Sequence, residues 1–433
     1  MKISDHIDKL SWSVADKLLY VIYGIVSLFQ IRAMDAAEFG LFAQMIGFHT
    51  WIFVVSDSFA LQNIIQFGAN LNNRGKVNLF AFLLHSIITI GITLTILLFK
   101  EPISVFFNQP RLVEVAIALP ILIILTVPRT FCLKLLLRDH KFKGIFFVNL
   151  AFFGLMTLIT VLFLFFYHKL DFQLMIILYF SGTLISSIVG ILICYKELIF
   201  SLKGEISLKT LTRFSFPLTM YSALYSMPKN LDIFIIQYFF STAVVGVYQS
   251  AKNLFRFFEE GVNLANGLVY PAAVKLIEKK DNKGLNDLIT KATSAMLFAY
   301  IFAFIILEIG LSHFIITTIL PQQYFFAVDY FNLMIIAALG MPFMVLSFII
   351  IASGKPETVF KYVLISLALF FSTLFLVGYY NEESLIPLGI VVFDISFGIF
   401  CFSHTKKMYN IGYRQLLRFF SDSIYFLKQK KRN

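Results

Sequence analysis

Residues 78–99 read NLFAFLLHSIITIGITLTILLF and carry no Lys, Arg, Asp or Glu. A transmembrane helix needs about 20 mostly apolar residues to cross the hydrocarbon core of a bilayer. A surface helix of a soluble protein would instead confine its apolar residues to one stripe and place charges opposite. The stretch therefore predicts a helix that lies in lipid.

Similar apolar runs recur along the chain, separated by short clusters of Gly, Pro, Asn and charged residues that mark loops. They predict an all-α polytopic membrane protein with about twelve spans. The fourth and seventh contain internal prolines, so their ends are the least sharply defined. The expected spans cover residues 13–32, 39–61, 78–99, 113–137, 144–167, 172–195, 212–239, 243–270, 289–311, 326–352, 359–380 and 385–404.

The composition of the whole chain agrees with this class. Of its 433 residues, 59% are hydrophobic and 14% are charged, and the mean hydropathy is +0.82. A soluble domain has roughly 25% charged residues, so this sequence does not suit a globular core in water. The formal net charge of +11 would suggest a nucleic-acid partner in a soluble protein. In a membrane protein, the distribution of these charges between the two sides of the bilayer must be considered first.

The sequence lacks the motifs that mark a nucleotide or metal site. Cys132, Cys194 and Cys401 are far apart and form neither a metal-binding spacing nor a disulfide framework. The nearest relative of a phosphate-binding loop, GKP at 354–356, lacks the rest of that motif. We therefore expect no metal, no cofactor and no enzyme activity. The N-terminus has acids near its start and no small-residue cleavage site, so we expect it to be retained.

The distribution of basic residues predicts the orientation of the chain, because cytoplasmic loops carry an excess of Lys and Arg. If the N-terminus is cytoplasmic, 26 of the 36 Lys and Arg lie in inner segments and 4 in outer loops. We therefore expect both termini to be cytoplasmic and no nucleic-acid partner. The basic, aromatic tail at 409–433 is expected on the anionic inner leaflet.

The second half of the chain resembles the first at an offset of about 206 residues. MDAAEFGLF at 34–42 aligns with FSTAVVGVY at 240–248, and both follow the first expected span of their half. Two six-span halves of like orientation predict a parallel repeat that can rock around a central cavity. Chance similarity between two apolar halves is the alternative. We assign 1–204 and 205–408 to two six-helix lobes, followed by the tail.

Polar residues at membrane depth indicate the substrate site. A charge there costs roughly 2.5–3.5 kcal/mol on insertion scales, so it must face a cavity or a partner. In the expected span 243–270, polar residues recur every three or four positions and so share one helical face: Gln249, Lys252, Arg256, Glu259, Glu260, Asn263 and Asn266. Arg256 can pair with Glu259 or Glu260 along the helix. A salt-bridge network between helices is the alternative to a cavity lining.

Other expected spans add four more cations: Lys17, Arg129, Lys134 and Lys229. Lys134 and Arg129 can extend toward the inner surface, and for Lys134 this is the favoured interpretation. Asp57 in the second span has two equally weighted interpretations. It is a structural partner of Lys17 or Arg256, or it binds a coupling ion.

Three stretches carry a family resemblance: AEFGLF at 37–42, FSFPLTMYSALYSMPKNLDIFII at 214–236 and VVGVYQSAKNLFRFFEEGVNLANGLVYPAAVKL at 244–276. The chain resembles the polysaccharide biosynthesis proteins, the Wzx-type O-antigen flippases of the multidrug/oligosaccharidyl-lipid/polysaccharide exporter superfamily. Length, span number and the two-lobed repeat agree over nearly the whole chain. The two further spans usual in lipid II flippases of this superfamily are missing.

The resemblance implies a bacterial inner-membrane protein that works by alternating access, in which an undecaprenyl-diphosphate-linked oligosaccharide is turned from the inner to the outer leaflet. Arg and Lys suit the diphosphate, and amides suit the sugar. The expected substrate-binding residues are Lys17, Arg129, Lys229, Lys252, Arg256, Asn263 and Asn266. Asp57, Glu259 or Glu260 would bind the proton or sodium ion that resets the carrier. Related flippases have a cavity cation on the second span, where this chain offers only Asp57. Membrane lipids and polysaccharide assembly proteins are the expected partners.

Three rival functions stay open. An ion-coupled multidrug antiporter of the same fold would favour acids over lysines in its cavity. A membrane-embedded glycosyltransferase, polymerase or ligase needs catalytic residues on a sizeable outer loop, and the expected outer loops are short. A structural scaffold would leave the charges at membrane depth unexplained.

Overall fold

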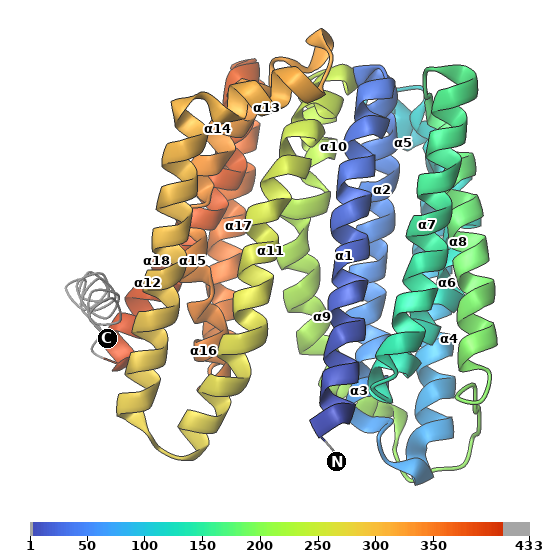
Figure 1. Cartoon of the computed structure of the whole chain (residues 1–433), viewed down its shortest axis with the longest axis vertical. Coiled ribbons are helices and arrows are strands. Elements are labelled where there is room, and N and C mark those ends of the chain that lie inside the picture. The colour runs from blue at the N-terminus through green and yellow to red at the C-terminus, as the bar shows by residue number, and fades with distance from the viewer. Residues whose placement is uncertain (1–2, 410–433) are drawn as a thin grey trace. The chain divides into compact units, whose positions relative to one another are not determined.

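The computed structural model describes residues 3–409, with side chains from Ser11 onward, and helices form nearly all of this region (Figure 1). The chain divides into two compact units, Met1–Gly246 and Val247–Asn433. The first contains α1 (Ile3–Ala33), α2 (Ala36–Ser56), the π-helical turn η1 (Asp57–Leu61), α3 (Gln62–Phe67), α4 (Leu71–Leu98), α5 (Lys100–Phe106), α6 (Leu112–Arg138), α7 (Phe142–Tyr167), α8 (Phe172–Cys194), α9 (Leu208–Asn230) and α10 (Asp232–Phe239).

Helix α11 (Thr242–Glu278) begins in the first unit and continues into the second. The second unit then contains α12 (Asn282–Ile306), η2 (Leu307–Leu311), α13 (Ser312–Ile319), η3 (Gln322–Tyr324), α14 (Ala327–Ala337), α15 (Met341–Met344), α16 (Leu346–Ala352), α17 (Pro356–Tyr379), η4 (Glu383–Leu385) and α18 (Leu388–Tyr409). Of the tail expected at 409–433, all but Tyr409 lies outside the described residues.

Within residues 3–409, nine helices are long and apolar enough to cross a membrane, and the bent pair Gln322–Ala337 and Met341–Ala352 adds a tenth. The two remaining expected spans are also helical. They are α9 with α10, and α11, which carry many of the polar residues from which the substrate site was predicted. Each of the twelve expected spans thus corresponds to a helix or a run of helices, and the predicted fold class is confirmed.

The order of elements in residues 3–194 recurs in residues 208–409. The counterpart of α1 is α9 with α10, and α2 through α3 correspond to α11. The later helices follow in the same order, with α4 matched by α12 through α13 and α6 by α14 through α16. Helices α7 and α8 are matched by α17 and α18. This recurrence agrees with the repeat predicted from the sequence, and the parallel orientation of its two halves stays a prediction.

Helices α9 and α10 pack on α2 within the first compact unit. The indole Nε1 of Trp51 on α2 donates to the carbonyl of Ala223 on α9 at 3.2 Å. The amides of Gln44 and Gln237 join α2 to α10 through a hydrogen bond of 2.9 Å. The first compact unit therefore extends past residue 204. The predicted boundary between residues 204 and 205 concerns the internal repeat, not the compact units, and it stays a prediction.

The core of the first unit lies around α6, which packs against α4 and α8, while α7 packs against α1 and α8 (Figure 1). Leu135, Leu136 and Val148 are fully buried there. The structure also brings together two cysteines that lie far apart in sequence. The Sγ atoms of Cys132 and Cys194 are 2.7 Å apart, both as buried free thiols.

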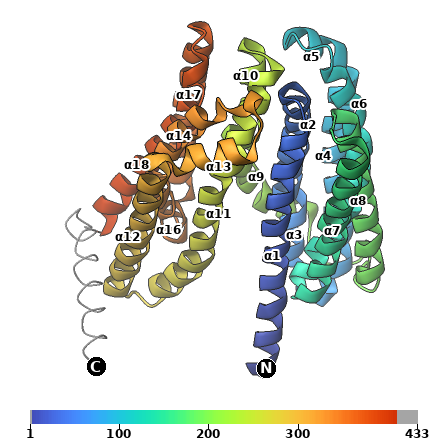
Figure 2. The same cartoon turned by 45° about the horizontal axis from the view of Figure 1, so that its top comes forward.

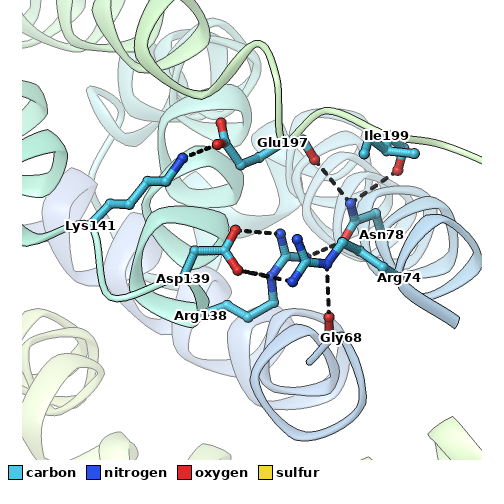
Figure 3. Close-up of polar contacts among 8 residues, drawn as sticks. All are labelled: Gly68, Arg74, Asn78, Arg138, Asp139, Lys141, Glu197 and Ile199. Carbon is cyan, nitrogen blue, oxygen red and sulfur yellow. Dashed lines mark hydrogen bonds and ion pairs between the residues drawn. The ribbon is translucent and has the colours of Figure 1, made fainter. Parts of the chain in front are cut away.

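The segment that joins α8 to α9 is held along the start of α4. Asn78 Nδ2 donates to the carbonyls of Glu197 at 3.2 Å and Ile199 at 3.0 Å (Figure 3). The backbone amide of Ser201 donates to the carbonyl of Gly75 at 3.2 Å. Because these bonds fix the backbone, the connection between the two repeats is ordered as far as α9.

In the second unit, α14 and α17 pack against α18 (Figure 2). Helix α15 packs against α18 as well. Small residues make this packing close. Ala337 and Ala338 are fully buried, and a Cβ built on Gly398 would lie 2.5 Å from the carbonyl oxygen of Gly340. Gly389 likewise has no room for a side chain beside Leu374.

Candidate functional site

Arg129 on α6 lies at the centre of a polar network that joins four helices of the first unit. Its Nε donates to Ser186 Oγ on α8 at 2.9 Å, and its Nη2 donates to Asn149 Oδ1 on α7 at 2.7 Å. Asn149 Nδ2 in turn donates to Asp16 Oδ1 on α1 at 2.7 Å. The guanidinium also lies 4.6 Å from the ring centre of Phe152. Arg129 is therefore held by protein groups on several sides.

Asp57 forms an ion pair that the sequence analysis did not predict. Lys134 Nζ on α6 lies 3.0 Å from both carboxylate oxygens, and Gln62 Nε2 donates to Oδ2 at 3.0 Å. The favoured interpretation of Lys134, extension to the inner surface, is wrong. Lys134 is also the ion-pair partner of Asp57, in place of the expected Lys17 or Arg256. The local cause is η1, a π-helical turn that begins at Asp57.

Two histidines that the sequence analysis passed over also belong to the polar interior of this unit. His85 on α4 is buried and hydrogen-bonds to Ser56 Oγ at 2.8 Å and Thr130 Oγ1 at 2.9 Å. His49 on α2 hydrogen-bonds to Thr126 Oγ1 at 3.2 Å. A single His in an apolar run gives no sequence signal for these partners, since they lie on other helices.

Lys17 and Lys229 lie near aromatic rings of their own helices. Lys17 on α1 is exposed, and its Nζ lies 5.4 Å from the ring centre of Tyr20. Lys229, in the last turn of α9, lies 5.0 Å from the ring centre of Tyr225. A cation over a ring face is attracted by the negative face of the ring, so both lysines gain a stabilising contact on their own helix.

The other predicted residues lie on α11 in the second unit, where the helix runs unbroken from Thr242 to Glu278. Lys252 is buried, with Nζ 5.5 Å from the ring centre of Tyr248. Glu259 is half-buried, whereas three other side chains of the polar stripe are exposed, namely Arg256, Glu260 and Asn263. The stripe predicted for one face therefore begins in the protein interior and continues on the surface of this unit.

Arg256 forms no ion pair with Glu259 or Glu260 among the described residues, so the pairing considered from the sequence is absent. Asn266 is half-buried, and its Oδ1 is a buried acceptor with no hydrogen-bond partner in the described part of the chain. A buried polar atom without a partner is rare in native proteins and often marks a ligand or a water site. The central part of α11 thus offers a cation and a free acceptor.

Lys17 and Arg256 differ in one respect from Lys134 and Arg129. Among the side chains of residues 11–409 both are exposed and neither forms an ion pair, whereas Lys134 is neutralised by Asp57 and Arg129 is held by Ser186 and Asn149. Exposed cations at the depth of a membrane span are those best able to bind an anionic ligand.

A second charged cluster lies at one end of the first unit (Figure 3). Arg138 donates two hydrogen bonds to Asp139, at 3.0 and 2.8 Å, and Arg74 adds a third at 3.2 Å. Arg138 Nη1 also donates to Asn78 Oδ1 at 2.9 Å. Burial alone would raise the pKa of the Asp139 carboxyl, but the hydrogen bonds and charges of Arg138, with the charges of Arg74 and Lys141, lower it below its ordinary value.

Comparison with known proteins identifies the family. The family model described as polysaccharide biosynthesis protein matches residues 31–329. The chain belongs to the polysaccharide biosynthesis protein family. The family match includes every predicted site residue except Lys17. None of the curated proteins compared with the chain matches it.

Solved structures share the fold of this family member over almost its full length. The lipid II flippase MurJ, in an inward closed conformation, is 14% identical, with a TM-score of 0.69, 96% of this chain covered and 91% of that chain. A multidrug-resistance MATE family transporter of the MOP superfamily, inward-facing, is 14% identical with a TM-score of 0.65, covering 93% and 94%. An outward-facing MATE structure is 13% identical with a TM-score of 0.64, covering 92% and 93%. At these identities the likeness establishes the fold, that of MOP-superfamily transporters.

Proposed function

We propose that this protein moves a lipid-linked oligosaccharide across a bacterial inner membrane. The substrate class is an undecaprenyl-diphosphate-linked repeat unit of a surface polysaccharide such as O-antigen, moved from the inner to the outer leaflet. Membership of the polysaccharide biosynthesis protein family and the transporter fold support this proposal. Translocation needs no covalent chemistry on the chain, so the protein would act as a carrier and not as an enzyme.

The observation that carries the proposal is the guanidinium of Arg256 on α11, which is exposed and forms no ion pair with the side chains of residues 11–409. Ten residues further along the helix, Asn266 Oδ1 is an acceptor with no hydrogen-bond partner in the same range. A guanidinium binds phosphate oxygens through two parallel hydrogen bonds, which suits a diphosphate. An amide oxygen accepts from a sugar hydroxyl. Lys17 on α1, in the first unit, stays a predicted diphosphate ligand.

The transport cycle would be alternating access. Fold neighbours adopt inward-facing and outward-facing conformations. In this chain the polar groups would bind the sugar diphosphate while the polyprenyl tail stays in lipid. Glu260, an exposed carboxylate one residue past Glu259 on α11, is the favoured group for a coupling proton or sodium ion. Asp57 is less suited to that role because Lys134 neutralises it.

The test is a gene deletion in the host bacterium, complemented with the wild-type chain, with Arg256→Gln, or with the control Lys275→Gln on the exposed end of the same helix. The deletion and Arg256→Gln should accumulate complete lipid-linked repeat units on the cytoplasmic face and lose surface glycan, whereas Lys275→Gln should complement. Surface glycan that is unchanged by the deletion would overturn the proposal.

An ion-coupled multidrug antiporter is the alternative, supported by the fold likeness to MATE transporters. The acids Asp16 and Glu260 at span depth would then bind an organic cation or the coupling proton or sodium ion. The same deletion separates the two functions. An antiporter predicts increased sensitivity to cationic drugs with normal surface glycan, and a flippase predicts the reverse.

A further inference from the structure

A cavity of about 420 Å³ opens at the end of the first unit where the N-terminal part of α1 meets α7 and α8. It lies outside the polar network of Arg129 and outside the α11 stripe, so the proposed transport does not use it. Its walls come from Trp12 on α1, the turn between α6 and α7, Phe147 on α7 and Ile193 on α8. The volume lies in the usual range for sites that hold small molecules, about 300–1,000 Å³.

One side of this cavity is apolar and aromatic. The ring of Trp12 packs against Phe146 and Phe147, with centroids 5.2 and 5.9 Å apart. Phe147 is 40% exposed although it is a large apolar side chain. Tryptophan is enriched where a transmembrane helix leaves the hydrocarbon and enters the headgroup region. This side therefore suits the part of an acyl chain that lies next to the lipid headgroup.

The other side is basic. His140, Lys141 and Lys143 line it, and the described lining residues include no acid. Lys141 forms an ion pair with Glu197 on the far side of the turn (Figure 3). Lys143 Nζ lies 5.5 Å from the Trp12 ring centre and forms no ion pair among the described residues, so its charge is available to a ligand.

The turn that carries these cations is fixed in place. His140 adopts the left-handed conformation with φ 52°, and the amide of Lys141 donates to the carbonyl of Leu136 at 2.9 Å. This six-to-one bond closes the end of α6 as in a Schellman motif. The basic groups therefore begin from a rigid backbone, next to the Arg138–Asp139 cluster.

We propose that this cavity binds one anionic glycerophospholipid from the adjacent leaflet, with its phosphate against Lys143 and His140 and its first acyl carbons against Trp12 and Phe147. The basic turn lies on the side where the Lys and Arg of the loops are concentrated, and basic pockets between transmembrane helices on that side suit anionic headgroups. An anionic lipid is favoured over a zwitterionic one because its headgroup carries a net negative charge that the basic turn attracts. The site is independent of the proposed transport.

The chain offers a direct probe of this site, because it contains two tryptophans and one of them, Trp12, lines the cavity. In a Trp51→Phe background, Trp12 fluorescence is measured in micelles with phosphatidylglycerol or phosphatidylcholine brominated at the same acyl carbons. The anionic lipid should quench Trp12 at lower mole fraction than the zwitterionic one. Lys143→Gln should weaken this preference about fivefold, because each basic residue near an anionic surface contributes on that scale. The control Lys209→Gln, an exposed lysine near the start of α9, should leave it unchanged.

Equal quenching by the two brominated lipids, or a preference that Lys143→Gln does not reduce, would overturn the proposal. A competition with lipids that carry no bromine gives a further outcome. If polyprenyl phosphate relieves the quenching at concentrations where unbrominated phosphatidylglycerol does not, the cavity belongs to the transport substrate and the lipid proposal is overturned. Trp51 donates a hydrogen bond to Ala223, so Trp51→Phe removes one contact. If that variant does not fold, native mass spectrometry of the wild-type chain and Lys143→Gln gives the same comparison through retained lipid adducts. No readout here requires transport, so the two proposals can fail separately.

Discussion

Gly40 on α2 and Gly246 on α11 meet at a helix crossing that leaves no space for a side chain on either. A Cβ on Gly40 would lie 2.0 Å from the carbonyl oxygen of Thr242, and a Cβ on Gly246 would lie 1.9 Å from that of Ala36. The contact is reciprocal, because Thr242 and Gly246 are the repeat equivalents of Ala36 and Gly40 at the offset read from the sequence. Such self-complementary contacts form on a two-fold axis. The crossing therefore supports both the repeat and its register.

Replacing either glycine of this crossing should destabilise the protein. Gly40→Ala or Gly246→Ala forces two helix backbones apart, and overpacking of this kind costs about 1–3 kcal/mol or more. The expected result is a lower midpoint of thermal unfolding in detergent. Gly91→Ala is the matched control, since no atom lies within 4 Å of a Cβ there and Ala favours a helix over Gly. A Gly40→Ala variant as stable as Gly91→Ala would show that the crossing is not tight.

The Asp57–Lys134 pair should behave as a coupled unit. Removing one partner leaves a charge at membrane depth, at a cost of roughly 2–3 kcal/mol. Asp57→Asn and Lys134→Gln should each lower stability, and the double variant should lose less than the two single losses combined. Unfolding in mixed micelles measures the four proteins of this cycle. Strictly additive losses would contradict the ion pair.

Substitutions at Arg129 and at Arg256 should have different effects, because Arg129 has a structural role and Arg256 is proposed to bind the substrate. Arg129→Met removes hydrogen bonds to Ser186 and Asn149, so it should lower the unfolding midpoint as well as transport. Arg256→Gln removes no ion pair among the described residues, so it should unfold like wild type. Transport should nevertheless fall at least about tenfold, since a charge-assisted hydrogen bond contributes roughly 1.5–3 kcal/mol.

Thermal unfolding and a flipping assay in vesicles, run on the same preparations, test this division. If Arg129→Met left stability unchanged and abolished flipping, Arg129 would be a substrate ligand as first expected from the sequence. Full flipping by Arg256→Gln would remove the central contact of the proposed mechanism.

Asp139 should make the stability of the first unit depend on pH in the acidic range. Its pKa is lowered in the folded chain, so its ionised form stabilises the fold above the unfolded pKa of about 3.9. That contribution is lost as the pH falls through the lower, folded value. Asp139→Asn should therefore be less stable than wild type at pH 7 by about 1–2 kcal/mol. The difference should shrink as the pH drops below 4.

Unfolding midpoints at several pH values check this, with Asp171→Asn as a control at the opposite end of the helices. Asp171 caps α8 through Leu174 and has no ion pair in the described residues. A gap between wild type and Asp139→Asn that stays constant down to pH 3 would contradict the ion pairs of Asp139 with Arg138 and Arg74.

Much of the fold could be predicted because the driving interaction is local in sequence. Twenty apolar residues in a row lower the free energy of insertion wherever they occur, so the run at 78–99 and its counterparts could be placed as spans without knowledge of their neighbours. The repeat could be read for a similar reason. The turn motifs around Gly40 and Gly246 are short, and each keeps its position relative to the span before it.

The partners of the buried charges could not be predicted in this way. Hydropathy says that Lys134 at membrane depth needs compensation, but not which helix supplies it. The answer, Asp57, lies 77 residues away in sequence and is turned toward α6 by a π-helical turn with no sequence signature. Cys132 and Cys194 meet for the same kind of reason, because α6 and α8 pack side by side.

The sequence by itself determined the membrane class, the spans, the repeat register and the residue types at membrane depth, since each rests on the transfer free energy or spacing of neighbouring residues. The tertiary structure decided which of those residues are neutralised. Asp57 and Lys134 compensate each other, Arg129 is satisfied by its neighbours, and Arg256 is left exposed. That division depends on the rotation of each helix about its own axis and on which helix lies beside it, and both are set by packing between segments distant in the chain.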